Sequence, residues 1–422
     1  MKRASKTSFC LPVVFAGQLL LAQSVSSPPG PPPPAISITK ELIEFFTPKD
    51  NPPSDAKVKL GDMLFDDKRL SADNTLACNV CHDPRAGFTA RTETGHGIRD
   101  QVGKRNTPTI LNAMFNRSQF WDGRAASLEE QAKMPILNPI EMGMKDGDEV
   151  VAKIAAIPEY VAAFQQVFGR PVNFDDMARA IAAFERARIS GDAPIDRFLR
   201  GDENALTAAQ RHGWSLFNGK GRCNGCHAFN ASYPFFTDQR FHNVGIAAHK
   251  TDFADLATLA GRSNPTPAEI DRMAIETNAS ELGRFLVSKN RSDIGAFKTP
   301  GLRDVVLTSP YMHDGSLATL WDVIDHYNKG GEINPFLDGG IERLGLSESE
   351  IDDLVDVMNA FTSDKYASQA AMEMTRQKTF QRTPRSTRDT DAALGRKMGH
   401  GDAVPDPDKK DPAFIGGRPV AQ

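Results

Sequence analysis

The sequence has few cysteines, tyrosines and tryptophans, no excess of basic charge and no uninterrupted apolar run long enough to span a bilayer. Its 422 residues include five cysteines, five tyrosines and three tryptophans, and the net charge is −4. This charge gives no basic field for a polyanion, so we expect no nucleic-acid partner. Hydrophobic residues at 40% and charged residues at 25% are typical of a globular chain. They exclude a collagen-like, wholly disordered or multi-span membrane protein.

The N-terminal segment has the pattern of an export signal. Lys2, Arg3 and Lys6 form a basic start, residues 9–22 are mostly apolar, and small residues follow. We therefore expect a cleaved signal peptide over residues 1–24. An uncleaved membrane anchor is the alternative, but the apolar stretch is shorter than the roughly 20 residues that a span needs.

The cysteines beyond the signal segment all lie in two Cys-x-x-Cys-His motifs. The motif residues are Cys78, Cys81 and His82, and Cys223, Cys226 and His227. In this motif both thiols form thioethers with a haem and the histidine binds its iron, so we expect two covalently bound haem c groups. Zinc binding or a redox dithiol is the alternative, but structural zinc needs four ligands placed together. Because c-type haem is attached outside the cytoplasm, we expect the protein in the periplasm.

The chain contains one unit twice: an amphipathic helix, a Cys-x-x-Cys-His motif, a loop-rich region and a closing amphipathic helix. We expect these helices at about 54–66 and 174–189, and after the capping signals at Thr207 and Ser347. The expected fold class is mainly α, with two tandem cytochrome c-like domains with long loops, each binding one haem. The expected segments are a signal peptide (1–24), a Pro-rich spacer (25–39), an N-terminal domain (40–200), a C-terminal domain (201–365) and a disordered tail (366–422).

Each haem iron also needs a second ligand or an open position, and this choice decides between an electron carrier and an enzyme. Spacing alone does not select the ligand. The candidates by reach are His96, His242, His249, His313, His326, Met312 and Met358.

Four stretches of the chain resemble the bacterial diheme cytochrome c peroxidase/MauG family. They are Arg105-Asn106-Thr107-Pro108-Thr109, Gln119-Phe120-Trp121-Asp122-Gly123-Arg124, Phe297-Lys298-Thr299-Pro300-Gly301-Leu302-Arg303 and Pro310-Tyr311-Met312-His313-Asp314-Gly315. The likeness extends from about residue 55 to residue 363. It implies that the N-terminal haem reacts with hydrogen peroxide and that the C-terminal haem relays electrons.

Carried over position by position, the resemblance implies a catalytic group of Trp121, Gln131, Pro135 and Glu141. Trp121 matches the tryptophan between the haems that passes electrons. Gln131 and Glu141 match the distal pair, and Pro135 matches the proline of the same pocket. A carboxylate beside peroxide can take a proton from one oxygen and return it to the other. By sequence alone, a glutamate such as Glu141 is more often a solvated loop carboxylate, and Trp121 is equally explained as a core aromatic; the resemblance reverses this preference for Glu141.

The resemblance also implies one Ca²⁺ ion between the haems. Asn106, Thr308 and Pro310 match its protein ligands. One side-chain oxygen and two backbone carbonyls, completed by waters, suit a hard cation. The threonine and the proline could equally be ordinary turn residues.

Two positions distinguish the branches of the family. His96 matches the distal histidine that closes the N-terminal haem in peroxidases that need reductive activation. Tyr327, fourteen residues after His313, falls where ordinary diheme peroxidases have a methionine ligand and MauG-like enzymes have a tyrosine. A phenolate stabilises oxidised iron and should lower the potential of the second haem. His326 is the alternative ligand.

One departure affects the MauG branch. Family members that oxidise tryptophans of a protein partner carry a surface tryptophan two residues before the second haem motif. This chain has Gly221 there, which leaves Trp214 and Trp321 as the candidates for such a route.

The sequence thus predicts an enzyme that reduces hydrogen peroxide with electrons from a small cytochrome c or cupredoxin. One alternative is MauG-like oxidation of a specific protein substrate through a bis-Fe(IV) state. A second alternative is a non-catalytic diheme electron carrier. The resemblance also implies a homodimer, although the sequence shows no interface.

Overall fold

The structure is a computed structural model that describes residues 38–250, 252–261 and 265–381, all within one compact unit, Ala35–Gln422. The expected signal peptide (1–24), nearly all of the spacer (25–39) and residues 382–422 lie outside the described residues. In the part that is described, no helix is both long and apolar enough to cross a membrane.

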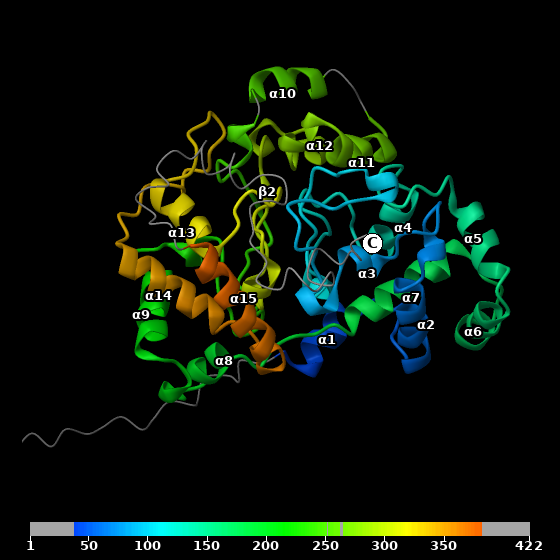
Figure 1. Ribbon diagram of the computed structural model, residues 1–422, viewed down its shortest axis with the longest axis horizontal. Helices are drawn as coiled ribbons and strands as arrows, with labels where there is room; N and C mark the ends of the chain where they lie inside the picture. Colours follow the sequence, from blue (N-terminus) through cyan, green and yellow to red (C-terminus); the bar gives the residue numbers. More distant parts are fainter. Residues whose placement is uncertain (1–37, 251, 262–264, 382–422) are drawn as a thin grey trace, which may run out of the picture. The chain divides into compact units, whose positions relative to one another are not determined.

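The described chain is mainly helical, as the sequence predicted (Figure 1). The helices of the first half are α1 (Lys40–Phe46), α2 (Asp55–Phe65), α3 (Cys78–Cys81), α4 (Leu128–Leu137), α5 (Gly147–Ala155), α6 (Pro158–Phe168), α7 (Phe174–Arg186) and α8 (Pro194–Leu199). Those of the second half are α9 (Ala208–Asn218), α10 (Phe253–Gly261), α11 (Pro267–Glu276), α12 (Phe285–Ser288), α13 (Leu320–Lys329), α14 (Glu348–Asn359) and α15 (Ala367–Phe380). The regions expected to be loops therefore contain α4 to α6 and α10 to α13. Two short strands, β1 (Phe241–His242) and β2 (Phe297–Lys298), pair antiparallel.

In the first half, α2 packs closely across α7 (Figure 1). Ser54 caps α2 and Asn173 caps α7, each accepting a backbone N–H with its side chain. A Cβ on Gly61 of α2 would lie 2.0 Å from the carbonyl oxygen of Ala180 in α7. Only glycine permits this approach, which brings the buried faces of the two helices together behind the first haem motif.

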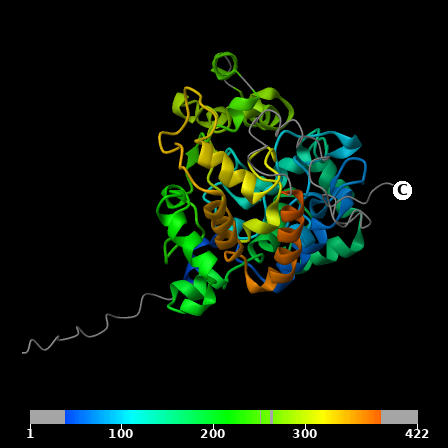
Figure 2. The ribbon, with the colours of Figure 1, turned by 60° about the vertical axis from the view of Figure 1, so that its left-hand side comes forward.

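In the second half, α9 and α14 repeat this arrangement (Figure 2, green and orange). Thr207 and Ser347 form the predicted capping boxes of the two helices. A Cβ on Gly213 would lie 2.0 Å from the carbonyl oxygen of Asp353. The same crossing in both halves confirms the prediction of a repeated cytochrome c-like unit.

Helix α8 connects the halves and makes its long-range polar contacts with the second one. The carboxylate of Asp196 accepts two hydrogen bonds from the guanidinium of Arg303, at 2.7 and 2.8 Å. The backbone N–H of Ile195 donates to the carbonyl of Ala360 at 3.1 Å. The expected boundary at residue 200 thus assigns to the first domain a helix that is bonded to the second.

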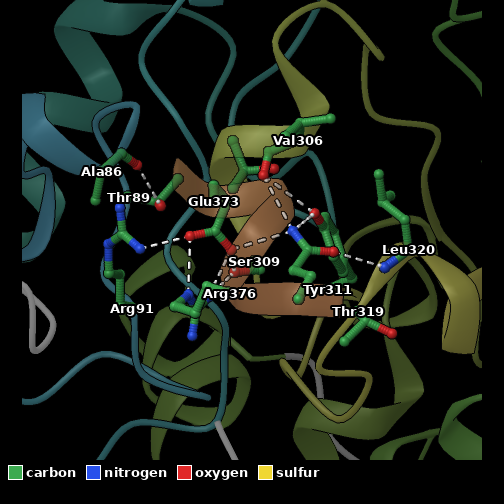
Figure 3. Close-up of polar contacts among 12 residues, drawn as sticks. Ala86, Thr89, Arg91, Val306, Ser309, Tyr311, Thr319, Leu320, Glu373 and Arg376 are labelled. Carbon is green, nitrogen blue, oxygen red and sulfur yellow. Dashed lines mark hydrogen bonds and ion pairs between the residues drawn. The ribbon is translucent and has the colours of Figure 1, made fainter. Parts of the chain in front are cut away.

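The expectation of a disordered tail from residue 366 is wrong for the described residues 366–381, because α15 is an ordered helix with a buried face. Glu373, Arg376 and Gln377 give this face a polar part, beside the apolar Ala370 and Met374 (Figure 3). The Glu373 carboxylate lies 2.5 Å from Arg91 of the first half and is also paired with Arg376. The hydroxyl of Ser309 donates to the same carboxylate at 2.5 Å. Burial raises the pKa of Glu373, but the two guanidinium groups outweigh burial and hold it below its ordinary value.

Candidate functional site

The first Cys-x-x-Cys-His motif lines a cavity of about 150 Å³. Cys78 and Cys81 bound the single turn of α3, and His82 follows directly. The Nδ1 of His82 lies 3.1 Å from the carbonyl oxygen of Phe88. With Nδ1 donating to this carbonyl, the imidazole presents the lone pair of Nε2 to a metal.

The second motif lines a larger cavity, of about 470 Å³. Cys223, Cys226 and His227 all contribute to its wall. The Nδ1 of His227 lies 2.9 Å from the carbonyl oxygen of Phe236, so this histidine is held in the same way as its counterpart in the first motif.

The residues present at both motifs fit a covalently bound haem. All four cysteines of the described chain are free thiols, as thioether formation requires. Burial lowers the pKa of His82 and of His227, which favours the neutral imidazole that binds iron. The apolar cavities, the thiols and the oriented imidazoles together provide what haem c attachment needs.

Trp121 lies in the wall of both cavities. Its indole N–H donates to the carbonyl of Asn106 at 2.9 Å. Its own carbonyl accepts the backbone N–H of Lys298 in β2 at 2.7 Å. Contacts from both halves of the chain therefore fix the tryptophan in the wall that the two cavities share.

The predicted distal residues Gln131, Pro135 and Glu141 all line the first cavity. Gln131 and Pro135 lie on α4, and Glu141 lies in the turn that follows this helix. Burial and the nearby carboxylate of Asp271 raise the pKa of Glu141 to about 7, against the opposing effect of Arg124. A carboxyl with a pKa near neutrality can both accept and return a proton.

His96 also lines the first cavity, with 29% of its side chain exposed. Its loop packs tightly against the turn that carries Glu141. The backbone N–H of Ile98 donates to the carbonyl of Glu141 at 2.8 Å. A Cβ on Gly97 would lie 1.6 Å from the carbonyl oxygen of Ile140. His96 is thus brought to the same cavity as the predicted distal group.

In the second cavity, Tyr327 of α13 lies in the wall, whereas its neighbour His326 does not. The Nε2 of His326 lies 2.8 Å from the carbonyl oxygen of Val244. Burial raises the pKa of Tyr327, so its phenol stays neutral unless a cation binds the oxygen. Of these two neighbouring residues, the geometry favours the tyrosine as a ligand.

Two other candidate histidines are held by carboxylates. His242 lies between Asp238, at 3.0 Å, and Asp338, at 2.7 Å. The hydrogen bond to Asp238 is the main cause that raises the pKa of His242 to about 11, so it is a cation and a poor metal ligand. His313 is buried with its Nε2 2.9 Å from Glu281. Met312 and Met358 line the second cavity; the side chain of His249 lies outside the described part.

The three residues matched to a calcium site gather at the second cavity. Asn106, Thr308 and Pro310 all line it. The Nδ2 of Asn106 donates to the carbonyl of Glu93 at 3.1 Å. This orientation leaves the amide oxygen of Asn106 as an acceptor for a cation.

Charged residues without a predicted role also line the first cavity. Arg124 and Lys298 belong to the family-like stretches, and burial lowers the pKa of Lys298 to about 8. Glu185 of α7 is 4% exposed, and burial raises its pKa to about 8. Asp271 of α11 contacts Arg124 from the other half of the chain. The family-like stretches of the sequence contain Arg124 and Lys298, whereas no sequence signal marked Glu185 or Asp271.

The fold and the two cavities define a c-type oxidoreductase with two haem sites. A family model described as di-haem cytochrome c peroxidase matches residues 55–204. The chain is 38% identical over 322 residues to the methylamine utilization protein MauG of Methylorubrum extorquens, covering 76% of this chain and 82% of that protein. It is 38% identical over 299 residues to the cytochrome c551 peroxidase of Pseudomonas aeruginosa, covering 69% and 77%.

Solved structures show the same likeness. The crystal structure of a MauG-like protein associated with microbial copper homeostasis matches with a TM-score of 0.63 and 31% identity, covering 75% of this chain and 92% of that one. The diheme peroxidase BthA of Burkholderia thailandensis shares the fold, with a TM-score of 0.59 at 22% identity and coverage of 75% and 88%. The chain belongs to the diheme cytochrome c peroxidase/MauG family. It is an oxidoreductase that acts on peroxide, and its family implies two haem c groups.

Proposed function

We propose that hydrogen peroxide is reduced in the N-terminal cavity with electrons relayed from the C-terminal haem. The observation that carries this proposal is the position of Glu141, whose pKa is near neutrality, in the cavity of the first haem motif. Bound haem supplies the iron that holds peroxide and stores the electrons for its reduction. The protein supplies proton transfer, orientation and the path between the two sites.

Glu141 moves the proton. As a carboxylate it accepts the proton of the peroxide oxygen that lies nearer the iron, and as a carboxylic acid it gives this proton to the other oxygen. The second oxygen then leaves as water. A group with a pKa of about 7 is suited to both steps at neutral pH.

Gln131 and Pro135 shape the same pocket from α4. The amide of Gln131 offers both a donor and an acceptor to peroxide or water. Pro135 has no N–H, so the carbonyl four residues earlier, that of Gln131, receives no helical hydrogen bond from it. We assign both residues to orienting the substrate.

Trp121 carries electrons between the two sites. Trp121 lines both cavities; its indole N–H donates to the carbonyl of Asn106, and its backbone carbonyl accepts the backbone N–H of Lys298. A rigid aromatic side chain between two redox centres shortens each electron-transfer step. The external donor would be a small cytochrome c or a cupredoxin.

A second candidate function is oxidation of a specific protein substrate, as in the MauG branch. Tyr327 favours it, because an anionic oxygen ligand would stabilise oxidised iron in the second cavity. A surface route is less favoured. Trp321 is 4% exposed and bonded to Asp352, and Trp214 is packed among phenylalanines. Neither indole lines the second cavity.

His96 would regulate access to the first haem. It lines that cavity from a loop packed against the Glu141 turn. As a second iron ligand it would close the site in the resting enzyme, and its release would open the site to peroxide.

A Ca²⁺ ion would be held by Asn106, Thr308 and Pro310. The carbonyl of Asn106 accepts the indole N–H of Trp121, so a cation bound to the side chain of Asn106 would also stabilise the inter-haem tryptophan. We further propose a periplasmic location after removal of the signal peptide (1–24), and a homodimer.

The replacement Glu141→Gln tests the proposal. We expect peroxide turnover to fall by about 10²–10⁴-fold while both haems stay attached. In the unmodified enzyme kcat/KM should rise with pH through about 7, since the carboxylate is the proton acceptor; in the variant this rise should disappear. The exposed Glu149 of α5 provides the control, because Glu149→Gln should leave turnover unchanged. Full turnover in Glu141→Gln would overturn the role assigned to Glu141. Absence of peroxide turnover in the unmodified holoenzyme would instead favour the third possibility, a diheme electron carrier.

A further inference from the structure

Arg124 is a buried cation in the N-terminal cavity wall, with 3% of its side chain exposed. Its Nε donates to Asp271 at 2.8 Å, and its Nη1 donates to Asp122 at 3.0 Å. Its Nη2 is buried and has no hydrogen-bond partner among the described residues. A buried guanidinium nitrogen without a partner is costly to a folded protein and therefore requires an explanation.

The two carboxylates keep Arg124 charged. Burial lowers the pKa of the guanidinium, but Asp122 and Asp271 outweigh this effect and raise it above its ordinary value. The guanidinium also lies 3.7 Å from the ring centre of Phe120. Carboxylates fix Nε and Nη1, and an aromatic ring covers one face of the planar guanidinium. Nη2 is therefore the remaining hydrogen-bond donor of a guanidinium fork whose orientation is fixed.

Asp271 connects this fork to the proton-transfer residue. Its second carboxylate oxygen accepts the side-chain N–H of Asn138 at 2.8 Å. The carbonyl of Asn138 in turn accepts the backbone N–H of Glu141 at 3.1 Å. One carboxylate from α11 therefore fixes both the guanidinium of Arg124 and the turn that carries Glu141.

We propose that Arg124 is a further catalytic residue, whose Nη2 donates a hydrogen bond to the outer oxygen of hydrogen peroxide, and that Asp271 is its positioning residue. This inference rests on the proposed function, because it takes the N-terminal cavity as the peroxide site. Nη2 of Arg124 would then have a hydrogen-bond partner of matching chemistry, because the outer peroxide oxygen becomes negative during the reaction.

The O–O bond breaks and its electron pair stays with the outer oxygen. This oxygen keeps its own proton, receives the one that Glu141 took from the inner oxygen, and leaves as water. Reduction of the inner oxygen to a second water takes two electrons, which the bound haems would supply and the small electron donor would replace, and two protons from solvent. A fixed cation beside the outer oxygen stabilises the charge in the transition state more than in neutral peroxide, which is the condition for catalysis.

The test compares Arg124→Lys, which keeps the charge but loses the fork, with the parent holoenzyme. The peroxide reaction should slow by about 10²-fold. Fluoride, an anionic probe that accepts hydrogen bonds, should bind the N-terminal haem about tenfold more weakly. Fluoride is titrated in the oxidation state in which this haem binds cyanide. Arg186 is the matched control. It is a buried arginine of the same half, paired with Glu129 at 2.7 Å, and Arg186→Lys should change neither value.

The pH profile tests the positioning role. Asp271 raises and Arg124 lowers the pKa of Glu141. The midpoint of the kcat/KM profile should therefore move to lower pH in Asp271→Asn and to higher pH in Arg124→Gln. A merely structural role would not shift the two midpoints in opposite directions.

The outcomes separate this inference from the proposed function. If Glu141→Gln is inactive while Arg124→Lys keeps both its peroxide rate and its fluoride affinity, Arg124 is not the donor and the peroxide site stands. A slower rate with unchanged fluoride affinity would also overturn the inference, because Arg124 would then act only through folding. If the N-terminal haem binds neither peroxide nor cyanide in any oxidation state, both proposals fail.

Discussion

We expect the phenol of Tyr327 to be the group that most affects the balance between the two proposed functions. It lines the second haem cavity, and burial raises its pKa. An oxygen ligand held as phenolate by iron would stabilise the oxidised state, whereas a thioether would stabilise the reduced state.

We therefore predict that Tyr327→Met raises the reduction potential of the C-terminal haem by tens of millivolts or more. A spectroscopic redox titration of the two haems measures it. Trp321→Phe, on the same helix but outside the cavity wall, is the control and should leave the potential unchanged. An unchanged potential in Tyr327→Met would mean that the tyrosine is not an iron ligand.

The sequence could predict which residues come together in the two cavities, while their catalytic roles stay predictions. The haem motifs are short and local, and the residues implied by the resemblance, Trp121 and Glu141 among them, do line the expected cavities. The pairing of Arg124 with Asp271 could not be predicted. These residues are far apart in the sequence, and their hydrogen bond forms only when α11 packs against the first half.

Helices differed in how far the sequence could predict them. The helices α2, α7, α9 and α14 have regular apolar periodicity and polar caps, so their positions were predicted within a few residues. Helix α15 was missed because its buried face contains Glu373, Arg376 and Gln377. With only Ala370 and Met374 as apolar residues on its buried face, this helix shows no sustained hydrophobic period.

This helix supplies a prediction about stability. Glu373→Gln leaves Arg91 and Arg376 buried with a neutral partner, which should lower the free energy of unfolding by about 3–5 kcal/mol. Urea unfolding of the holoprotein, followed by helical circular dichroism, measures the change. Thr375→Ala, on the exposed face of α15, should cost far less.

Equal stability of the Glu373→Gln and Thr375→Ala variants would show that the network of Figure 3 does not anchor α15. Substitutions at exposed positions usually change the free energy of unfolding by no more than about 0.5 kcal/mol. The two outcomes are therefore well separated.

For the whole molecule, the repeated unit explains why two haem sites occur in one chain. Each half supplies a glycine-mediated helix crossing and a Cys-x-x-Cys-His motif that lines one cavity, and residues of the other half complete the wall of that cavity. The halves are not independent, since Arg91, Trp121 and Arg124 each contact residues of the other half. The length and the duplicated motifs predicted two units, but not these connections, which depend on long-range packing.

The most direct test of the account mixes one equivalent of hydrogen peroxide with protein in which only the C-terminal haem is reduced, and follows both haems by stopped-flow absorbance. We predict that the C-terminal haem is oxidised as peroxide disappears, and that Trp121→Phe slows this oxidation about tenfold or more while both haems remain attached. Disappearance of peroxide with the C-terminal haem still reduced would contradict the relay. Oxidation at the same rate in Trp121→Phe would show that electrons do not pass through Trp121.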